Sequence, residues 1–123
     1  MAQFIRNAVE GEDIVLKSKG LQKFSYVYIA DAVAGIFKVI LDGVPGEAYN
    51  ISADCDGRNL GQYAEYIASL GGKRVIYDIE NNPNASQAMN ALLDNSKIKK
   101  LGFVPQYSVI EGLERTYKIY KLD

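Results

Sequence analysis

A tyrosine and a lysine near the end of the chain have the spacing of a catalytic pair. Tyr117 and Lys121 stand four residues apart, so on a helix the ammonium would lie beside the phenol and could lower its pKa. No glycine-rich turn and cofactor strand come before this pair, and Tyr117 also falls on the apolar side of the last expected helix. We therefore interpret the pair as structural.

The other groups that could do chemistry are few. Asp54 and Asp56 lie two residues apart, but the further oxygen ligands and the spacing of a calcium loop are missing, so we expect solvated turn carboxylates. The chain has no histidine, the usual base for a serine or cysteine nucleophile and the commonest ligand of zinc, copper or iron. Neither a Gly-x-Gly-x-x-Gly turn nor a Walker loop is present. These residues predict no catalytic, cofactor-binding or metal-binding site.

The composition is that of one ordinary globular domain, with 123 residues, 48% hydrophobic and 24% charged. The net charge of -1 comes without runs of one sign, so no nucleic acid or anionic membrane is expected as a partner. The longest apolar stretch, 26–41, contains Asp31 and Lys38 and is too short to cross a bilayer. The lone Cys55 excludes an intramolecular disulfide and fits a reducing compartment such as the cytoplasm.

The spacing of apolar residues predicts four to five helices. The first ends at Gly11, and a short one runs from Asp94 or Ser96 to Leu101. Others begin at an Asp31 cap, at an Asn59 cap and at the capping box Ser108-Val109-Ile110-Glu111. The faces expected to be buried are Val33, Ile36, Phe37, Ile40 and Leu41 in the second helix, and Ile110, Leu113, Tyr117 and Tyr120 in the last.

Short strands are expected between the helices, at 14–16, 24–29, 48–51 and 74–77, because these segments are rich in β-branched and aromatic residues. The Asn-rich segment 80–91 is expected to be a mobile loop with a helical turn near Gln87. The alternation of short strands and helices predicts a mixed α/β layer structure. The first helix starts without a capping side chain, which favours a chain cut from something longer.

Four groups of residues, in order along the chain, resemble one known family. They are Phe4-Ile5 with Gly11 and Ile14-Val15-Leu16; Gly20 with Ser25-Tyr26-Val27-Tyr28-Ile29-Ala30-Asp31-Ala32; Gly46-Glu47-Ala48-Tyr49-Asn50-Ile51; and Leu93-Asp94-Asn95-Ser96-Lys97 with Leu101-Gly102-Phe103-x-Pro105 and Glu111-Gly112-Leu113. Together they are similar to the C-terminal region of extended short-chain dehydrogenase/reductases, the NAD-dependent epimerase/dehydratase family.

This resemblance implies that residues 1–123 form a single C-terminal substrate-binding domain, a fragment of a longer enzyme whose Rossmann half is absent. In the family that N-terminal half binds NAD or NADP and carries the catalytic serine or threonine and the Tyr-x-x-x-Lys pair. The substrate would be a nucleotide sugar and the parent activity that of an epimerase or a dehydratase. The fragment alone is expected to bind no cofactor and to be inactive.

The candidate substrate-binding residues also come from the resemblance. In the family, an arginine that meets the substrate phosphate precedes an aromatic residue that lies near the nucleotide. Tyr26 matches the aromatic position, whereas Phe24 occupies the arginine position and Lys23 beside it is a poor geometric substitute. We hypothesise that Tyr26 lines the nucleotide pocket; the alternative is a core aromatic packed with Phe24 and Tyr28.

Two further expectations remain open. In the family a second arginine that contacts the phosphate often precedes the Asp-x-Ser-Lys motif, and it has no counterpart between Glu80 and Leu93. The two missing arginines favour a second interpretation, a stand-alone non-catalytic binding or sensor module derived from the family. If the chain is a fragment, the face that packs against the Rossmann half should be an exposed apolar patch that invites self-association. Such a face would also invite loop disorder, and the first helix and the loop 80–91 are the candidates for that mobility.

Overall fold

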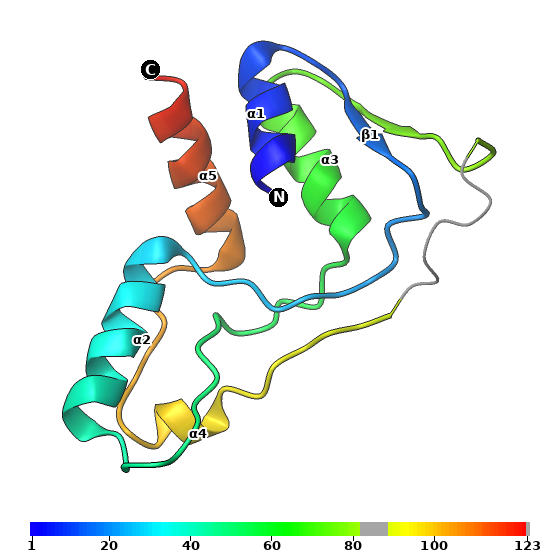
Figure 1. Cartoon of the computed structure of the whole chain (residues 1–123). Coiled ribbons are helices and arrows are strands. Elements are labelled where there is room, and N and C mark those ends of the chain that lie inside the picture. The colour runs from blue at the N-terminus through cyan, green and yellow to red at the C-terminus, as the bar shows by residue number, and fades with distance from the viewer. Residues whose placement is uncertain (82–88, 123) are drawn as a thin grey trace.

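A computed structural model describes residues 1–81 and 89–122. These residues form five helices, α1 (Ala2–Glu10), α2 (Ile29–Asp42), α3 (Leu60–Leu70), α4 (Ser96–Lys99) and α5 (Val109–Tyr120), and two strands, β1 (Ile14–Leu16) and β2 (Val75–Tyr77). The two strands pair in parallel, with Ile14 opposite Val75 (Figure 1). The expected mixed α/β organisation is confirmed. No helix within the described ranges is long and apolar enough to span a membrane.

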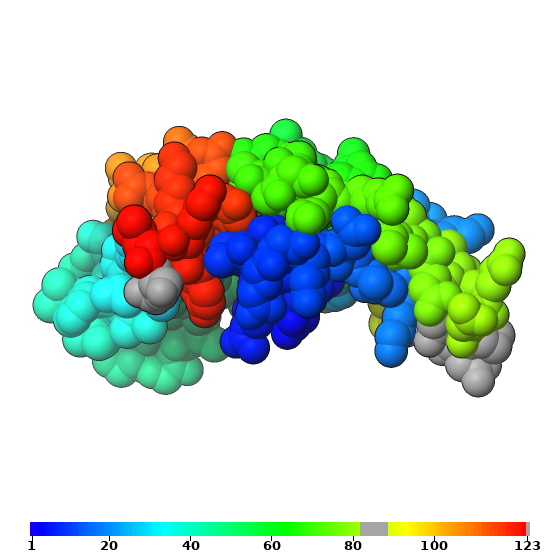
Figure 2. All heavy atoms as spheres, turned by 90° about the horizontal axis from the view of Figure 1, so that it is seen from above, coloured from blue at the N-terminus to red at the C-terminus, as the bar shows by residue number. Residues whose placement is uncertain are grey.

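The core lies between α1, α3, α5 and β1. Its fully or nearly fully buried side chains include Ile5, Ile14, Ala64, Ile67 and Leu113. Viewed from above, α5, α1 and α3 pack side by side (Figure 2). A Cβ at Gly71 would lie 2.3 Å from the carbonyl oxygen of Ala8, so a glycine is needed where the end of α3 meets α1. Each fully buried isoleucine contributes about 1.5–3 kcal/mol to folding.

Several helix ends agree with the expectations from local sequence. Gly11 ends α1 in the left-handed conformation, with φ 78°. Asn59 caps α3 and Ser108 caps α5, each accepting a hydrogen bond from the backbone N–H three residues later. The start of α1 at Met1 has no side-chain cap. Local chemistry was therefore enough to place these ends.

The expected start of α2 is wrong. Tyr28 is the N-cap residue, and Asp31 lies inside the first turn, where its side chain is 2% exposed. The carboxylate does not bind its own helix terminus. It accepts hydrogen bonds from the backbone N–H groups of Gln106 and Tyr107, which belong to the segment before α5. A long-range contact has taken the place of the local cap.

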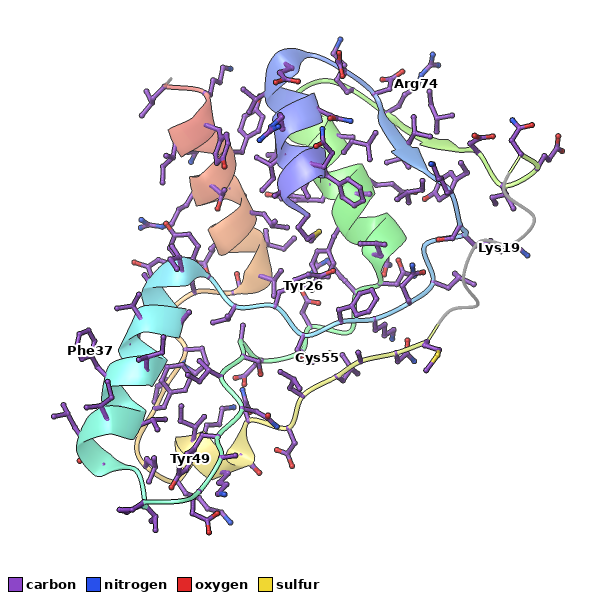
Figure 3. The ribbon with its side chains drawn as sticks, in the orientation of Figure 1. Lys19, Tyr26, Phe37, Tyr49, Cys55 and Arg74 are labelled. Atoms are coloured by element: carbon purple, nitrogen blue, oxygen red, sulfur yellow. The ribbon has the colours of Figure 1, made fainter. Side chains whose placement is uncertain are left out.

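The expected buried face of α2 is also wrong. Its large apolar residues are exposed to solvent, from 43% for Val33 to 77% for Leu41. Phe37 points away from the rest of the molecule (Figure 3). The side of the helix that faces the chain carries Asp31 and Gly35 instead. By contrast α1, which was expected to be mobile, contributes Ile5 and Ala8 to the core.

Two expected strands form no ladder in the described ranges. The segment 24–29 contributes one parallel bridge, Phe24 to Ala91, and its last residue begins α2. The segment 48–51 is assigned to no strand. The expected strands at 14–16 and 74–77 are confirmed as β1 and β2. The expected helical turn near Gln87 lies outside the described residues.

Two smaller differences concern the last helices. α4 ends at Lys99, short of Leu101, and Asn95 stands at its start, while Asp94 accepts a hydrogen bond from the N–H of Ser96. In α5, Leu113 is buried as expected, but Tyr120 is 46% exposed because the helix extends past the end of the core.

Candidate functional site

Tyr26 lies between the core and a chain segment that crosses the molecule. Its ring makes T-shaped contacts with the rings of Phe24 and Tyr63, at centroid distances of 6.4 Å and 5.5 Å. Its carbonyl oxygen accepts a hydrogen bond of 2.8 Å from the N–H of Ala53. Half-burial raises the pKa of the Tyr26 hydroxyl, so the phenol is neutral near pH 7.

Tyr26 lines an apolar cavity of about 320 Å³ at the start of α1, beside α5. Its lining residues are Met1, Ala2, Ile5, Tyr26, Val27, Tyr28, Ile29, Val109, Gly112, Leu113 and Thr116. None of them carries a charged side chain, so the side chains of the cavity offer aromatic and aliphatic contacts to a ligand. Such a space suits the flat, weakly polar part of a ligand.

Lys23 and Phe24 lie beside this cavity without lining it. The N–H of Lys23 donates to Oδ1 of Asn90 at 2.9 Å, and its carbonyl accepts from the N–H of Ala91 at 2.8 Å. Phe24 is 36% exposed and reaches Tyr26 only through the ring contact described above. The structure therefore brings Phe24 to Tyr26 and ties the Lys23 backbone to the segment that starts at residue 89.

A chain of hydrogen bonds runs from the buried Tyr63, which packs against Tyr26, to the exposed residues Asp56 and Arg58. Tyr63 is 3% exposed, and its hydroxyl donates to Asp56 at 2.6 Å. Arg58 binds the other carboxylate oxygen at 2.6 Å. Burial and the hydrogen bond to Asp56 raise the pKa of Tyr63. This chain holds the ring of Tyr63 at a fixed place against Tyr26.

The two loop aspartates have separate partners. Asp56 was expected to be a solvated turn carboxylate, but it accepts hydrogen bonds from Tyr63 and Arg58. Asp54 is 65% exposed and pairs with Lys99, and the hydrogen bond from that lysine lowers the pKa of Asp54. Among the described residues, no three histidine, cysteine, aspartate or glutamate side chains are grouped to hold a metal ion.

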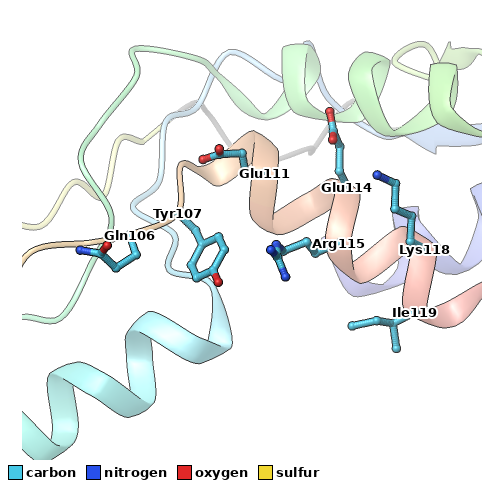
Figure 4. Close-up of a pocket in the computed structure, with 7 residues that line it drawn as sticks. All are labelled: Gln106, Tyr107, Glu111, Glu114, Arg115, Lys118 and Ile119. Carbon is cyan, nitrogen blue, oxygen red and sulfur yellow. The ribbon is translucent and has the colours of Figure 1, made fainter.

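A second hollow, of about 410 Å³, lies on the outer face of α5 and was missed by the sequence analysis (Figure 4). It is lined by Gln106, Tyr107, Glu111, Glu114, Arg115, Lys118 and Ile119. The Arg115 guanidinium stacks over the ring of Tyr107 at 4.7 Å, and Glu114 accepts a hydrogen bond from Tyr66. The recurrence of charged residues every three or four positions along 111–118 was the signal that could have found this face.

The spaced pair Tyr117 and Lys121 is not arranged for catalysis. The Lys121 ammonium lies over the ring of Tyr117, 5.9 Å from its centroid. Tyr117 itself packs partly buried against the core. The chain's residues also do not fit a dinucleotide, because neither β1 nor β2 leads through a glycine-rich turn into a helix N-terminus in the described ranges.

Sequence comparison identifies proteins that are similar to this chain. The sequence profile of the NAD dependent epimerase/dehydratase family matches residues 1–52. The dTDP-glucose 4,6-dehydratase of Escherichia coli is 28% identical, over 94% of this chain and 35% of its own. The low-salt glycan biosynthesis protein Agl12 of Haloferax volcanii is 27% identical, over 96% of this chain and 38% of its own. The chain belongs to the NAD-dependent epimerase/dehydratase family.

Solved structures of family members agree with this assignment. The UDP-glucose 4-epimerase of Thermotoga maritima, solved with UDP-glucose, superposes with a TM-score of 0.84 at 26% identity, over 98% of this chain and 38% of that one. The dTDP-glucose 4,6-dehydratase DesIV of Streptomyces venezuelae, solved with NAD and TYD, has a TM-score of 0.80 at 25% identity, over 100% and 38%. This family member thus spans less than two fifths of the length of these relatives, and the resemblance to the family is confirmed.

Proposed function

We propose that this chain is the C-terminal, substrate-holding portion of a nucleotide-sugar epimerase or dehydratase, and that it works with a Rossmann portion that binds NAD or NADP. One observation carries the proposal: nearly the whole chain matches little more than a third of enzymes that were solved with NAD or a nucleotide sugar. Among the residues that the structure describes, no glycine-rich turn joins β1 or β2 to a helix as a dinucleotide site requires, which supports a role in binding the substrate rather than the cofactor.

In this proposal the chain contributes to the reaction by holding the nucleotide sugar in position. In this proposal the nucleotide base lies against Tyr26 at the mouth of the apolar cavity, with Phe24 and Lys23 beside it. Binding energy gained far from the reacting carbon orients the sugar and excludes water from the cleft. Phe24 provides no bidentate donor for a phosphate, so we expect weaker binding of the diphosphate than an arginine at this position would give.

A titration of the ¹⁵N-labelled chain with UDP-glucose and with dTDP-glucose tests this role. We expect shifts of amide resonances around Tyr26 and at the start of α1, and loss of these shifts in Tyr26→Ala. Tyr120→Ala is the matched control, because Tyr120 is 46% exposed at the far end of α5. Retained shifts in a folded Tyr26→Ala variant would remove Tyr26 from the site.

The same labelled chain tests whether cofactor binding and catalysis depend on the Rossmann portion. We expect no heat of binding with NAD and no turnover of either nucleotide sugar by the chain alone. Tight stoichiometric NAD binding, or redox-linked conversion of the sugar by this polypeptide, would contradict the proposal.

A stand-alone binding or sensor module is the second candidate, and Phe24 in place of an arginine favours it. The discriminating observation is whether a reading frame for a glycine-rich Rossmann portion accompanies this chain. In both cases we propose a cytoplasmic location, because the lone cysteine, Cys55, is exposed as a free thiol.

A further inference from the structure

The helix α2 carries a broad apolar surface that the described chain leaves uncovered. Its members, called the α2 stripe, are Ile29, Val33, Ile36, Phe37, Ile40 and Leu41 on the helix and Val44 just after it, and their exposure ranges from 43% to 77%. Single exposed apolar residues are normal on a protein surface, whereas a continuous patch of this kind marks an interface. Figure 2 shows α2, in cyan, at one end of an elongated molecule.

The helix cannot turn this surface inward, because its opposite side is held at two points. The buried carboxylate of Asp31 accepts N–H groups of Gln106 and Tyr107 at 2.9–3.1 Å. One turn later, a Cβ at Gly35 would lie 2.6 Å from Cγ2 of Ile51, so the two segments are in close contact there. With 100° between successive residues, Val33, Ile36 and Ile40 must then face away from the chain.

The composition of α2 is that of a helix buried on both sides. Apart from the pair formed by Lys38 and Asp42 at 2.8 Å and the carboxylate of Asp31, it has no charged side chain. A helix that is apolar around most of its circumference belongs to the interior of a larger structure. The α2 stripe therefore indicates that a further layer of protein packs against the outer side of this helix.

The lengths of the relatives indicate what that layer is. The Thermotoga epimerase superposes on 98% of this chain with only 38% of its own length. The rest of that enzyme therefore has to contact the matched portion at some face. The other helices offer no comparable face: α1 and α3 pack into the core, and the outer face of α5 is charged. Within the described chain, other exposed apolar residues such as Val15 and Ile76 lie on three-residue strands, whereas the members of the α2 stripe follow one another along a single helix and its C-terminal end.

We propose that the α2 stripe is the surface on which the NAD-binding portion docks, whether that portion lies on the same polypeptide or on a separate one. This inference rests on the proposed function and adds the place of contact. The helix then lies as a layer between the two portions, with Asp31 and Gly35 toward this chain and the stripe toward the partner.

A chimera tests the docking surface. The matched 38% of the Thermotoga epimerase is replaced by this chain, and Ile36→Glu is compared with Ile119→Glu. The two isoleucines are a matched pair, since both lie on helices and are 51% and 54% exposed. In the NAD-loaded chimera we expect hydrogen exchange of the α2 amides to be at least about tenfold slower than in the isolated chain.

The variants decide the outcome in that chimera. Ile36→Glu should abolish this protection, because docking would bury an unpaired carboxylate. Ile119→Glu should leave the protection unchanged. An NAD-loaded chimera in which α2 stays unprotected, or in which both variants behave alike, overturns the proposed docking surface. Loss of UDP-glucose binding while the protection still depends on Ile36 would instead contradict only the proposed substrate-holding role.

The isolated chain provides a test that does not need a folded chimera. By sedimentation velocity and hydrogen exchange we expect exchange at α2 to be faster than at α3, with weak self-association that Ile36→Glu removes. A stable dimer in which α2 is protected would mean that a second copy covers the stripe, and it would overturn the proposal. A monomer with α2 as protected as α3 would overturn it too.

Discussion

Replacement of Asp31 by alanine tests the contact that fixes α2 on the rest of the chain. The side chain is 2% exposed and accepts hydrogen bonds from two backbone N–H groups, those of Gln106 and Tyr107. Alanine removes the acceptor and leaves both donors without a protein partner. Asp31 also lies in the first turn of α2, where a negative charge is favourable.

The size of the effect follows from these contacts. Each buried donor left unsatisfied costs roughly 1–3 kcal/mol, and the lost charge at the helix start adds about 0.3–1 kcal/mol. The desolvation of a buried carboxylate, which the variant no longer requires, offsets part of this loss. Gln106 is itself exposed, so water reaches one donor. We therefore expect Asp31→Ala to lower the free energy of unfolding by about 2–4 kcal/mol.

The assay is urea unfolding followed by circular dichroism, with the free energy of unfolding taken at an unchanged slope. Asp42→Ala is the control, since this exposed residue on the same helix pairs only with Lys38 and should cost less than about 1 kcal/mol. Asp31→Asn, which keeps one carbonyl oxygen, should fall between the two. Equal losses of unfolding free energy for Asp31→Ala and Asp42→Ala would refute the stabilising role of the Asp31 hydrogen bonds.

Three further predictions concern other elements. Asn59→Ala removes the α3 cap and should cost about 1 kcal/mol in the same unfolding assay; no loss would mean that the capping hydrogen bond adds no stability. The hydrogen bond to Glu114 and burial raise the pKa of Tyr66 to about 12, so the stability it adds is present below pH 10.0 and is lost as the pH rises through about 12. In a spectrophotometric titration, Tyr66→Phe should remove one phenol that ionises near pH 12. Gly71→Ala should destabilise the chain by about 1–3 kcal/mol, because its Cβ would lie 2.3 Å from the Ala8 carbonyl oxygen; a neutral effect would show that α1 and α3 can separate freely.

Local sequence was sufficient wherever a few neighbouring residues settle the backbone. Gly11 ends α1 because the left-handed conformation suits a residue without a Cβ, and the Ser108 box starts α5 because its hydrogen bonds are closed within four residues. The order of motifs along 4–113 also sufficed to find the family. Of the candidate site, the resemblance selected Tyr26, which does line a cavity. The charged face around Arg115 was not predicted, because charged residues at helical spacing are also typical of an ordinary solvent-exposed helix face.

Tertiary structure decided which surfaces meet. Hydrophobic periodicity identified the apolar side of α2 correctly, but it could not say whether this chain or another portion covers that side. Which side of α2 faces this chain depends on Asp31. Its carboxylate could accept N–H groups either at the start of its own helix or from a distant segment, and in the structure it accepts those of the segment before α5. The strand expected at 24–29 likewise depended on a partner, and Ala91 supplies a single bridge. Burial and strand pairing are properties of two surfaces in contact, and one stretch of sequence specifies only one of them.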